Sequence, residues 1–355
     1  MSIPTEPIGS IPRSPELLQA IQAHGAGRLP AAVLEAAYDD AVRDTLRRFA
    51  ETGSPVITDG EQRKSSFATY PLEGSTNLAP DGVVIPFKDG HTRQLPRLTR
   101  GPFRYGKYAG EYLQKAKPHT TRPLKQAVIS ASALSLLYPP NGIAGYSREE
   151  FVEDLIRESV ADILSAFTAG AQTVQIDFTE GRLSLKLDPS GALLRSFVEL
   201  NNRVLGSFSD AERARIGVHV CPGGDHDSTH SADVDYAGLL PELFAMQAGR
   251  FYLQLSSEPD RRRVLGLIAG LLGKERKVFV GVIDPISARV DSPEEVCHRV
   301  LEAAGLLPLS QLGTTDDCGF SPFADDTSTA RDVAFAKIRA RVEGTALAAS
   351  RLGIR

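Results

Sequence analysis

The chain has 355 residues, of which 42% are hydrophobic and 24% are charged, and its formal net charge is −4. These values are ordinary for a globular protein with a sizeable core, and they exclude a strongly basic chain of the kind that binds nucleic acid. No run approaches the ~20 apolar residues that span a bilayer, and residues 1–12 show no charged leader followed by an apolar stretch. We therefore expect a cytoplasmic protein without a membrane or nucleic-acid partner.

Short apolar runs alternate with helical periodicity along almost the whole chain. In chain order, the runs cover residues 8–10, 56–59, 127–130, 174–177, 217–221, 251–255, 278–283 and 314–318. The clearest helical stretches cover residues 150–169, 192–205, 236–248, 262–272 and 294–306. Eight successive β-then-α units predict a (β/α)8 TIM barrel that occupies residues 1–355 as a single domain. No Gly-x-Gly-x-x-Gly follows a predicted strand, so a dinucleotide-binding fold is not favoured.

One connection is much longer than the others. Residues 62–125 separate the second and third predicted strands, and an insertion of this length in a compact domain is usually functional. Its later part, residues 88–125, holds ten Lys or Arg residues and two acidic residues. Two interpretations remain open, a solvated excursion or a basic lid that attracts an anionic substrate to the barrel.

Polar side chains gather where the predicted strands end. Ser10, Asp59, Glu61, Asp177, Glu180, His219, Cys221, Asp284 and Cys318 all lie at or just after such an end. The active site of a parallel barrel forms at the C-terminal ends of its strands. This shared position predicts one site at that end of the barrel.

A histidine and two cysteines have the character of a metal site. His219 and Cys221 are two residues apart on a predicted strand, so their side chains point to the same side. Cys318 follows the eighth predicted strand, and barrel closure can bring it towards the fifth. One nitrogen and two sulfur ligands, with a position left open for substrate, predict a zinc site. The alternative is that all three are inert core residues.

Other candidate ligands are less favoured. His226 and His230 offer a rival set, but they lie in a loop, residues 222–235, that we expect to be flexible. Cys297 lies in a predicted helix and is interpreted as a buried structural thiol.

Five short segments, taken in order, resemble the catalytic half of cobalamin-independent methionine synthase. They are Ile8-Gly9-Ser10, Asp59-Gly60-Glu61, Val174-Gln175-Ile176-Asp177, Val218-His219-Val220-Cys221 and Asp317-Cys318-Gly319-Phe320. The resemblance covers nearly the whole chain and places it in the uroporphyrinogen decarboxylase/methionine synthase-like barrel superfamily. The N-terminal half of the family, which faces the methyl donor, has no counterpart in this sequence, so a core-only relative is expected.

The resemblance implies roles for individual residues. His219, Cys221 and Cys318 match the zinc ligands. Ile8, Gly9 and Ser10 match the turn that holds the carboxylate of an amino-acid thiol such as homocysteine, and Glu61 and Asp177 match the carboxylates that bind its amino group. These residue types suit those roles, because a Gly-Ser turn offers donors to an anion and a carboxylate neutralises an ammonium. The alternative for Glu61 and Asp177 is capping of the following helix.

Two departures from the family are visible. The family's fourth zinc ligand is a glutamate, where this chain has Gln254, with Glu258 four residues further on. The family stacks its folate on a tryptophan, and this chain has none. The resemblance therefore does not carry over a folate-type donor.

Together with the predicted zinc site, the resemblance implies zinc-dependent transfer of an alkyl group, most simply methyl, to a small thiol, with zinc-bound thiolate as nucleophile. Glu180 and Asp284 are candidates for an acid that protonates the leaving group. One alternative couples an epoxide or other alkyl donor to a sulfonated thiol. Another is a metal-free decarboxylase in which Arg13, Arg63 and Arg182 bind carboxylates, and a third is a catalytically inactive binding protein. The oligomeric state stays open, a homo-oligomer included.

Overall fold

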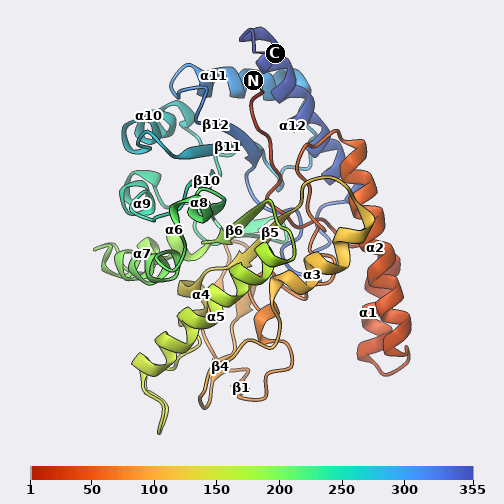
Figure 1. Ribbon diagram of the computed structural model, residues 1–355, viewed down its shortest axis with the longest axis vertical. Helices are drawn as coiled ribbons and strands as arrows, with labels where there is room; N and C mark the ends of the chain where they lie inside the picture. Colours follow the sequence, from red (N-terminus) through yellow and green to blue (C-terminus); the bar gives the residue numbers. More distant parts are fainter. Residues whose placement is uncertain (1, 355) are drawn as a thin grey trace.

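The computed structural model describes residues 2–354, and its centre is a curved parallel sheet with helices outside it (Figure 1). The sheet has six strands in the order β12-β11-β10-β7-β6-β5. Their bounds are β5 (Lys125–Ile129), β6 (Thr173–Asp177), β7 (Ile216–Val220), β10 (Arg250–Leu253), β11 (Lys277–Ile283) and β12 (Leu312–Asp316). Nearly every residue of these strands is buried, as expected where side chains on one face fill the barrel and those on the other pack against helices.

Two further segments close this sheet into a barrel. Thr5 forms a parallel bridge with β12, and Ile57 forms one with Leu124, the residue before β5. The two segments are joined to each other, because the Thr58 hydroxyl donates a 2.7 Å hydrogen bond to the carbonyl of Gly9. The predicted (β/α)8 barrel is confirmed, although its first two strands are reduced to single bridges.

The predicted positions of three strands need correction. Residues 8–10 are not a strand, since the first segment pairs only at Thr5, and Ile57 is the only bridged residue of 56–59. Prolines at positions 4 and 7 cannot donate to a ladder, which explains why pairing does not extend along the first segment. The last strand runs from Leu312 to Asp316, so Asp317 and Cys318 lie beyond its end.

All five predicted helices are present and begin within two residues of their expected starts, although the helix predicted over 236–248 ends at residue 243. The helices are α1 (Pro15–Gly25), α2 (Ala31–Glu51), α4 (Ala131–Ser135), α5 (Arg148–Thr168), α6 (Glu180–Leu187), α7 (Ala192–Leu205), α8 (Asp210–Arg213), α9 (Tyr236–Leu243), α10 (Arg261–Leu271), α11 (Pro293–Ala304) and α12 (Arg331–Arg351). Cys297 is buried in α11, as predicted. Among residues 2–354, no helix is both long enough and apolar enough to cross a membrane.

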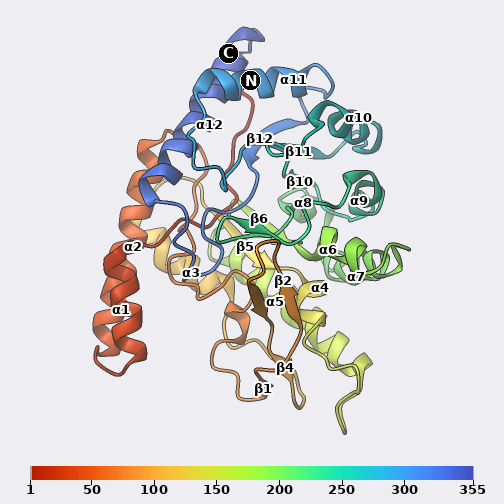
Figure 2. The same cartoon turned by 180° about the vertical axis from the view of Figure 1, so that it is seen from behind.

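The insertion, residues 62–125, is ordered by two small antiparallel ladders, one α-helix and two short 3-10 helices, η1 (Tyr70–Leu72) and η2 (Lys117–His119). β1 (Leu78–Ala79) pairs with β4 (Arg97–Leu98), and β2 (Val84–Pro86) pairs with β3 (Thr92–Gln94). Helix α3 (Ala109–Ala116) packs against α5 and β5, so it takes a place among the outer helices. Figure 2 shows β1, β2 and β4 extending from one side of the barrel, away from α11 and α12.

Candidate metal and substrate site

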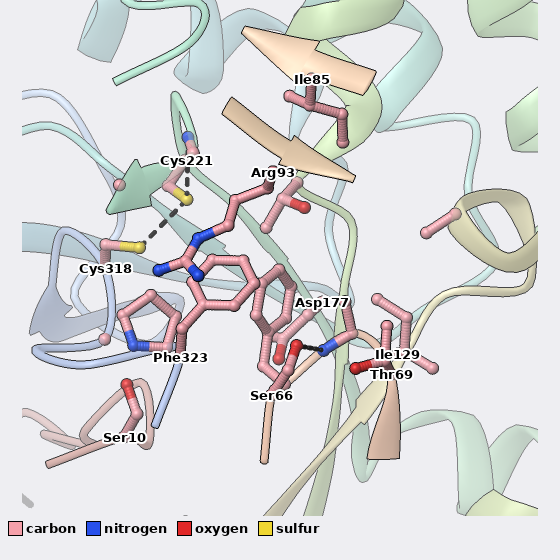
Figure 3. Close-up of a pocket in the computed structure, with 18 of the residues that line it drawn as sticks. Ser10, Ser66, Thr69, Ile85, Arg93, Ile129, Asp177, Cys221, Cys318 and Phe323 are labelled. Atoms are coloured by element: carbon pink, nitrogen blue, oxygen red, sulfur yellow. Dashed lines mark hydrogen bonds between the residues drawn. The ribbon is translucent and has the colours of Figure 1, made fainter. Parts of the chain in front are cut away.

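A cavity of about 490 Å³ lies at the C-terminal ends of the strands. Its wall includes every residue that the sequence assigned to metal or substrate: Ile8, Gly9, Ser10, Glu61, Asp177, His219, Cys221 and Cys318. Several of these are labelled in Figure 3. The fold therefore gathers into one place side chains that follow the first two barrel segments and the strands β6, β7 and β12, because the same ends of these strands meet there.

The two cysteines and the histidine are close enough to share one ion. His219 is on β7, Cys221 directly follows it, and their ligand atoms lie within 4.8 Å of one another and of Cys318. The sulfurs of Cys221 and Cys318 are 3.2 Å apart, which is far beyond the ~2.05 Å of a disulfide. Figure 3 shows both sulfurs directed at each other.

The histidine is held in a form suited to metal binding. Nδ1 of His219 lies 3.3 Å from the carbonyl oxygen of Tyr252, and because that oxygen can only accept, Nδ1 carries the hydrogen. Nε2 is buried and has no hydrogen-bond partner. A backbone partner on one ring nitrogen with a free lone pair on the other is the usual arrangement of a metal-bound histidine.

The cysteines also fit a cation. The hydrogen bond with Cys221, together with burial, raises the pKa of the Cys318 thiol well above its ordinary value. The N–H of Gly223 donates a 3.4 Å hydrogen bond to Sγ of Cys221, which favours a thiolate there. A divalent cation between the sulfurs removes their mutual repulsion, so this donor set fits zinc.

Neither candidate for the fourth ligand joins this group. Arg182 is buried, and its Nη1 donates to Oε1 of Gln254 at 2.6 Å and to Oε1 of Glu258 at 2.9 Å. The sequence leaves open whether Gln254 or Glu258 contacts a metal, and in this structure both side chains accept from Arg182. The open side of the cluster faces the cavity.

The rival histidines His226 and His230 do not belong to one common group of candidate metal ligands. His230 is buried, its Nδ1 lies 2.9 Å from the hydroxyl of Ser231, and burial lowers its pKa to about 4. His226 lies with Asp225 and Asp326, but a guanidinium already occupies this group. The loop 222–235 is also less irregular than expected, because β8 (Gly224–Asp225) and β9 (Ser228–Thr229) form a hairpin.

Ser10 lies where two loops touch. Its hydroxyl oxygen accepts a 3.2 Å hydrogen bond from the N–H of Ser321, and its own proton remains free to be donated. A Cβ on Gly319 would lie 2.1 Å from Oγ of Ser10, so a side chain at position 319 would displace the Ser10 hydroxyl from this place. The contact joins the first segment to the loop that carries Cys318.

The two carboxylates assigned to an amino group differ in their partners. Glu61 has a positive φ of 56°, with its N–H bonded to Asp59, and its carboxylate pairs with buried Lys64 at 3.0 Å. Asp177 accepts a 2.7 Å hydrogen bond from Gln175, and burial, reinforced by Glu61 and opposed by His219, raises its pKa to about 6. Neither residue is an N-cap, since Thr179 is the N-cap residue of α6 and Thr69 is that of the 3-10 helix that follows Glu61.

Of the two candidate acids, only Glu180 lines the cavity. Burial raises the pKa of Glu180 to about 7, against hydrogen bonds from Ser130 and Ser132. Asp284 is outside the cavity wall, and its carboxylate accepts from the N–H of Ile286.

The insertion covers the cavity with the β2–β3 hairpin. Arg93 of this hairpin lies across the ring of Phe323, with 4.1 Å between guanidinium and ring centre (Figure 3). The same guanidinium donates to Asp225 and Asp325, each at 3.0 Å. The arrangement of Arg93 therefore does not support the interpretation of the insertion as a basic lid that attracts an anionic substrate. Elsewhere in it, Arg97, Arg104 and Lys107 also pair with acids.

The arginines proposed for a decarboxylase do not face the cavity. Arg13 donates to the carbonyls of Glu61 and Lys64, both at 2.7 Å, and Arg63 pairs with acids of α2. Arg182 donates to Gln254 and Glu258. None of the three lines the cavity, so the decarboxylase alternative has no support from the site.

Sequence reasoning missed Arg93 and Lys64. Arg93 lies in an insertion without a recognisable pattern, and its partners are more than 130 positions away. Lys64 could have been found more easily from the sequence, since Glu61-x-x-Lys64 places opposite charges in one turn after a predicted strand end.

The fold and the site define a class of protein: a (β/α)8 barrel with an imidazole and two thiols on the wall of a cavity at the C-terminal ends of its strands. Residues 3–341 match the profile of the family described as "Cobalamin-independent synthase, Catalytic domain", and the chain belongs to this family. The resemblance stated from the sequence is thereby confirmed.

Individual relatives are distant. A methionine synthase of Sulfurisphaera tokodaii is 24% identical over 354 residues, covering 97% of this chain and 91% of the relative. A 5-methyltetrahydropteroyltriglutamate–homocysteine methyltransferase of Nitratidesulfovibrio vulgaris is 27% identical, and the match covers 90% of this chain but 39% of the longer relative. The solved structure of a B12-independent methionine synthase from Shewanella sp. W3-18-1, in complex with selenomethionine, covers 100% of both chains with a TM-score of 0.79 at 19% identity. At that identity the likeness shows the fold.

Proposed function

We propose that this protein is a zinc-dependent methyltransferase that methylates the thiol of homocysteine. The observation that carries the proposal is the convergence of His219, Cys221 and Cys318, with Nε2 of His219 buried and unpartnered. Membership of the synthase family and the names of the relatives support methyl transfer to this thiol.

His219, Cys221 and Cys318 would hold the metal. When bound there, zinc supplies a position that keeps a substrate thiol deprotonated near neutral pH. No described residue completes a fourth ligand, because Arg182 engages both Gln254 and Glu258. The cavity beside His219, Cys221 and Cys318 would leave room for the substrate sulfur next to a metal held by these residues.

The chain's own residues then orient the amino acid. The Ile8-Gly9-Ser10 turn offers a hydroxyl and backbone amides to the substrate carboxylate, and Asp177 offers a carboxylate to its ammonium group. The β2–β3 hairpin of the 62–125 insertion acts as a lid that limits water in the cavity. Holding the thiol at a fixed place next to the methyl donor makes the transfer an effectively unimolecular step instead of a bimolecular one.

Metal content and thiol binding test the proposal together. Cobalt-substituted protein should change its absorption spectrum when homocysteine is added, and calorimetric titration of the zinc form should show release of a proton on binding. Absence of both signals in fully metal-loaded protein would refute thiol activation.

A further inference from the structure

The cavity has more carboxylates than cations. Among its described lining residues, four carry carboxylates, which are Glu61, Asp177, Glu180 and Asp325, and one, Arg93, carries a permanent positive charge. Arg93 is already neutralised by two aspartates, and Glu61 is neutralised by Lys64 from behind the wall. Asp177 and Glu180 have no such cation, and the proposed function uses only Asp177.

Glu180 is the remaining carboxylate, and the proposed function gives it no role. Its Oε1 accepts a 2.6 Å hydrogen bond from Ser130 and a second hydrogen bond from Ser132, which in turn accepts one from Asn201. Its Oε2 is buried and has no partner. An oriented carboxylate with one unused oxygen at a cavity wall is a site for a positive charge.

Most of the surface of the remaining wall is apolar, although hydroxyl and amide side chains such as Ser66, Thr69 and Gln94 also line it. It includes Phe67, Phe87, Phe323, Ile85, Leu95 and Leu183. Phe67 and Phe323 meet edge to face with 5.5 Å between ring centres. Aromatic rings attract cations that carry alkyl groups, and such cations lose little hydration on entering an apolar site.

We propose that the methyl donor is an onium ion, a sulfonium or quaternary ammonium compound whose positive charge lies beside Glu180. This inference rests on the proposed function, because it names the second substrate of the same site. A polyanionic donor, in contrast, meets no unpaired cation on the described wall of the cavity.

The reaction balances without an acid. The substrate thiol loses its proton to solvent before transfer, and its sulfur then forms a bond to the methyl carbon. The bond from that carbon to the donor's sulfur or nitrogen breaks, and its electron pair stays on the leaving atom. The leaving group departs as a neutral thioether or tertiary amine, so no protonation is needed.

A charged probe and its uncharged isostere test the site by binding alone. In calorimetry on zinc-loaded protein, choline should bind at least about tenfold more tightly than 3,3-dimethyl-1-butanol, in which carbon replaces the charged nitrogen. Glu180→Gln should remove most of this preference, and Phe67→Leu should reduce it. Glu199→Gln, which removes an exposed carboxylate of α7, should leave it unchanged. Equal binding of the two probes to the wild type would overturn the inference.

A transfer assay completes the test. With homocysteine and trimethylsulfonium, methionine and dimethyl sulfide should form in equal amounts, while 5-methyltetrahydrofolate with three glutamates should give none. If the folate alone gives methionine, the inference fails and the proposed function stands. If homocysteine leaves the cobalt spectrum unchanged, the proposed function fails, whereas the preference for choline can still be measured.

Discussion

The ammonium group of Lys64 lies 3.0 Å from Oε1 of Glu61, and both side chains are buried, Glu61 in the cavity wall and Lys64 behind it. Lys64 also donates a 2.9 Å hydrogen bond to the carbonyl of Ala127 on β5. The charge of Glu61 is therefore already compensated by the protein. Of the two carboxylates predicted to bind an amino group, Asp177 on the neighbouring strand β6 is therefore the one whose charge is not balanced by a salt bridge.

Replacing Asp177 should affect thiols according to whether they carry an amino group. Asp177→Asn should weaken homocysteine binding by on the order of 2–4 kcal/mol, the range for removing one side of a buried charged pair. Binding of 3-mercaptopropionate, which has no amino group, should change little. Calorimetry with both thiols measures the difference, and an equal loss for both would show that Asp177 supports the site rather than the ammonium.

Replacing Lys64 should affect folding. Lys64→Met leaves Glu61 buried without its partner, so the free energy of unfolding should fall by about 3–5 kcal/mol. Chemical denaturation measures this change. In the double variant Lys64→Met/Glu61→Gln most of the loss should be recovered, and failure to recover it would mean that packing of the lysine stem, not charge, holds this turn.

The zinc site should depend on two of the three cysteines. Purified protein should contain about one zinc per chain, and Cys221→Ser or Cys318→Ser should lose most of it, because serine is a poor ligand for this ion. Cys297→Ser, which changes a thiol buried in α11, is the matched control and should keep the metal. Elemental analysis measures the zinc content, and full retention of zinc in both Cys221→Ser and Cys318→Ser would refute the proposed site.

The pH dependence of stability should reveal Glu180. Burial raises its pKa to about 7, whereas a glutamate in the unfolded chain has a pKa of ~4.3. The folded state therefore binds the proton more tightly, and this contribution to stability is complete at low pH and is lost as pH rises towards about 7. Hydrogen bonds from Ser130 and Ser132 lower the pKa of Glu180, whereas the nearby negative charge of Asp177 raises it further.

In the variant Glu180→Gln the side chain cannot ionise, so its stability does not fall in this way as the pH rises. Relative to the wild type, it should gain on the order of 2–3 kcal/mol of stability between about pH 5 and pH 8, because the raised pKa no longer opposes folding. Denaturation at the two pH values measures the gain, with Glu199→Gln as the control for a simple change of net charge. A constant difference between variant and wild type would mean that Glu180 titrates normally.

Much of this site was predictable because barrel strands end at one common edge. His219 and Cys221 share a strand, and Cys318 and Asp177 follow strand ends, so the sequence pattern placed them together. The partners of Gln254 were not predictable, since Arg182 reaches it from 72 positions away. The first strand was misplaced for a local reason, because apolar residues 8–10 look like a strand yet turn into the cavity after Pro7.

The β2–β3 hairpin should be held closed by Arg93. Its guanidinium joins Asp225, whose side chain is fully buried, to Asp325, and it stacks on Phe323. Breaking an ion pair at a buried carboxylate costs far more than breaking an exposed pair, because the carboxylate is left without compensation. Arg93→Met should therefore release the hairpin from the barrel, and amide exchange in Val84–Pro86 and Thr92–Gln94 should become at least about tenfold faster.

A matched change in the same insertion gives the control. Arg97 pairs with Asp81, whose side chain is 63% exposed, and surface pairs of this kind contribute about 0–1 kcal/mol. Arg97→Met should therefore leave exchange in β2 and β3 nearly unchanged. Hydrogen exchange followed by mass spectrometry compares the two variants directly. If both accelerate exchange equally, the hairpin is held by the insertion as a whole; if neither does, its packing over the cavity is sufficient and Arg93 is not its latch.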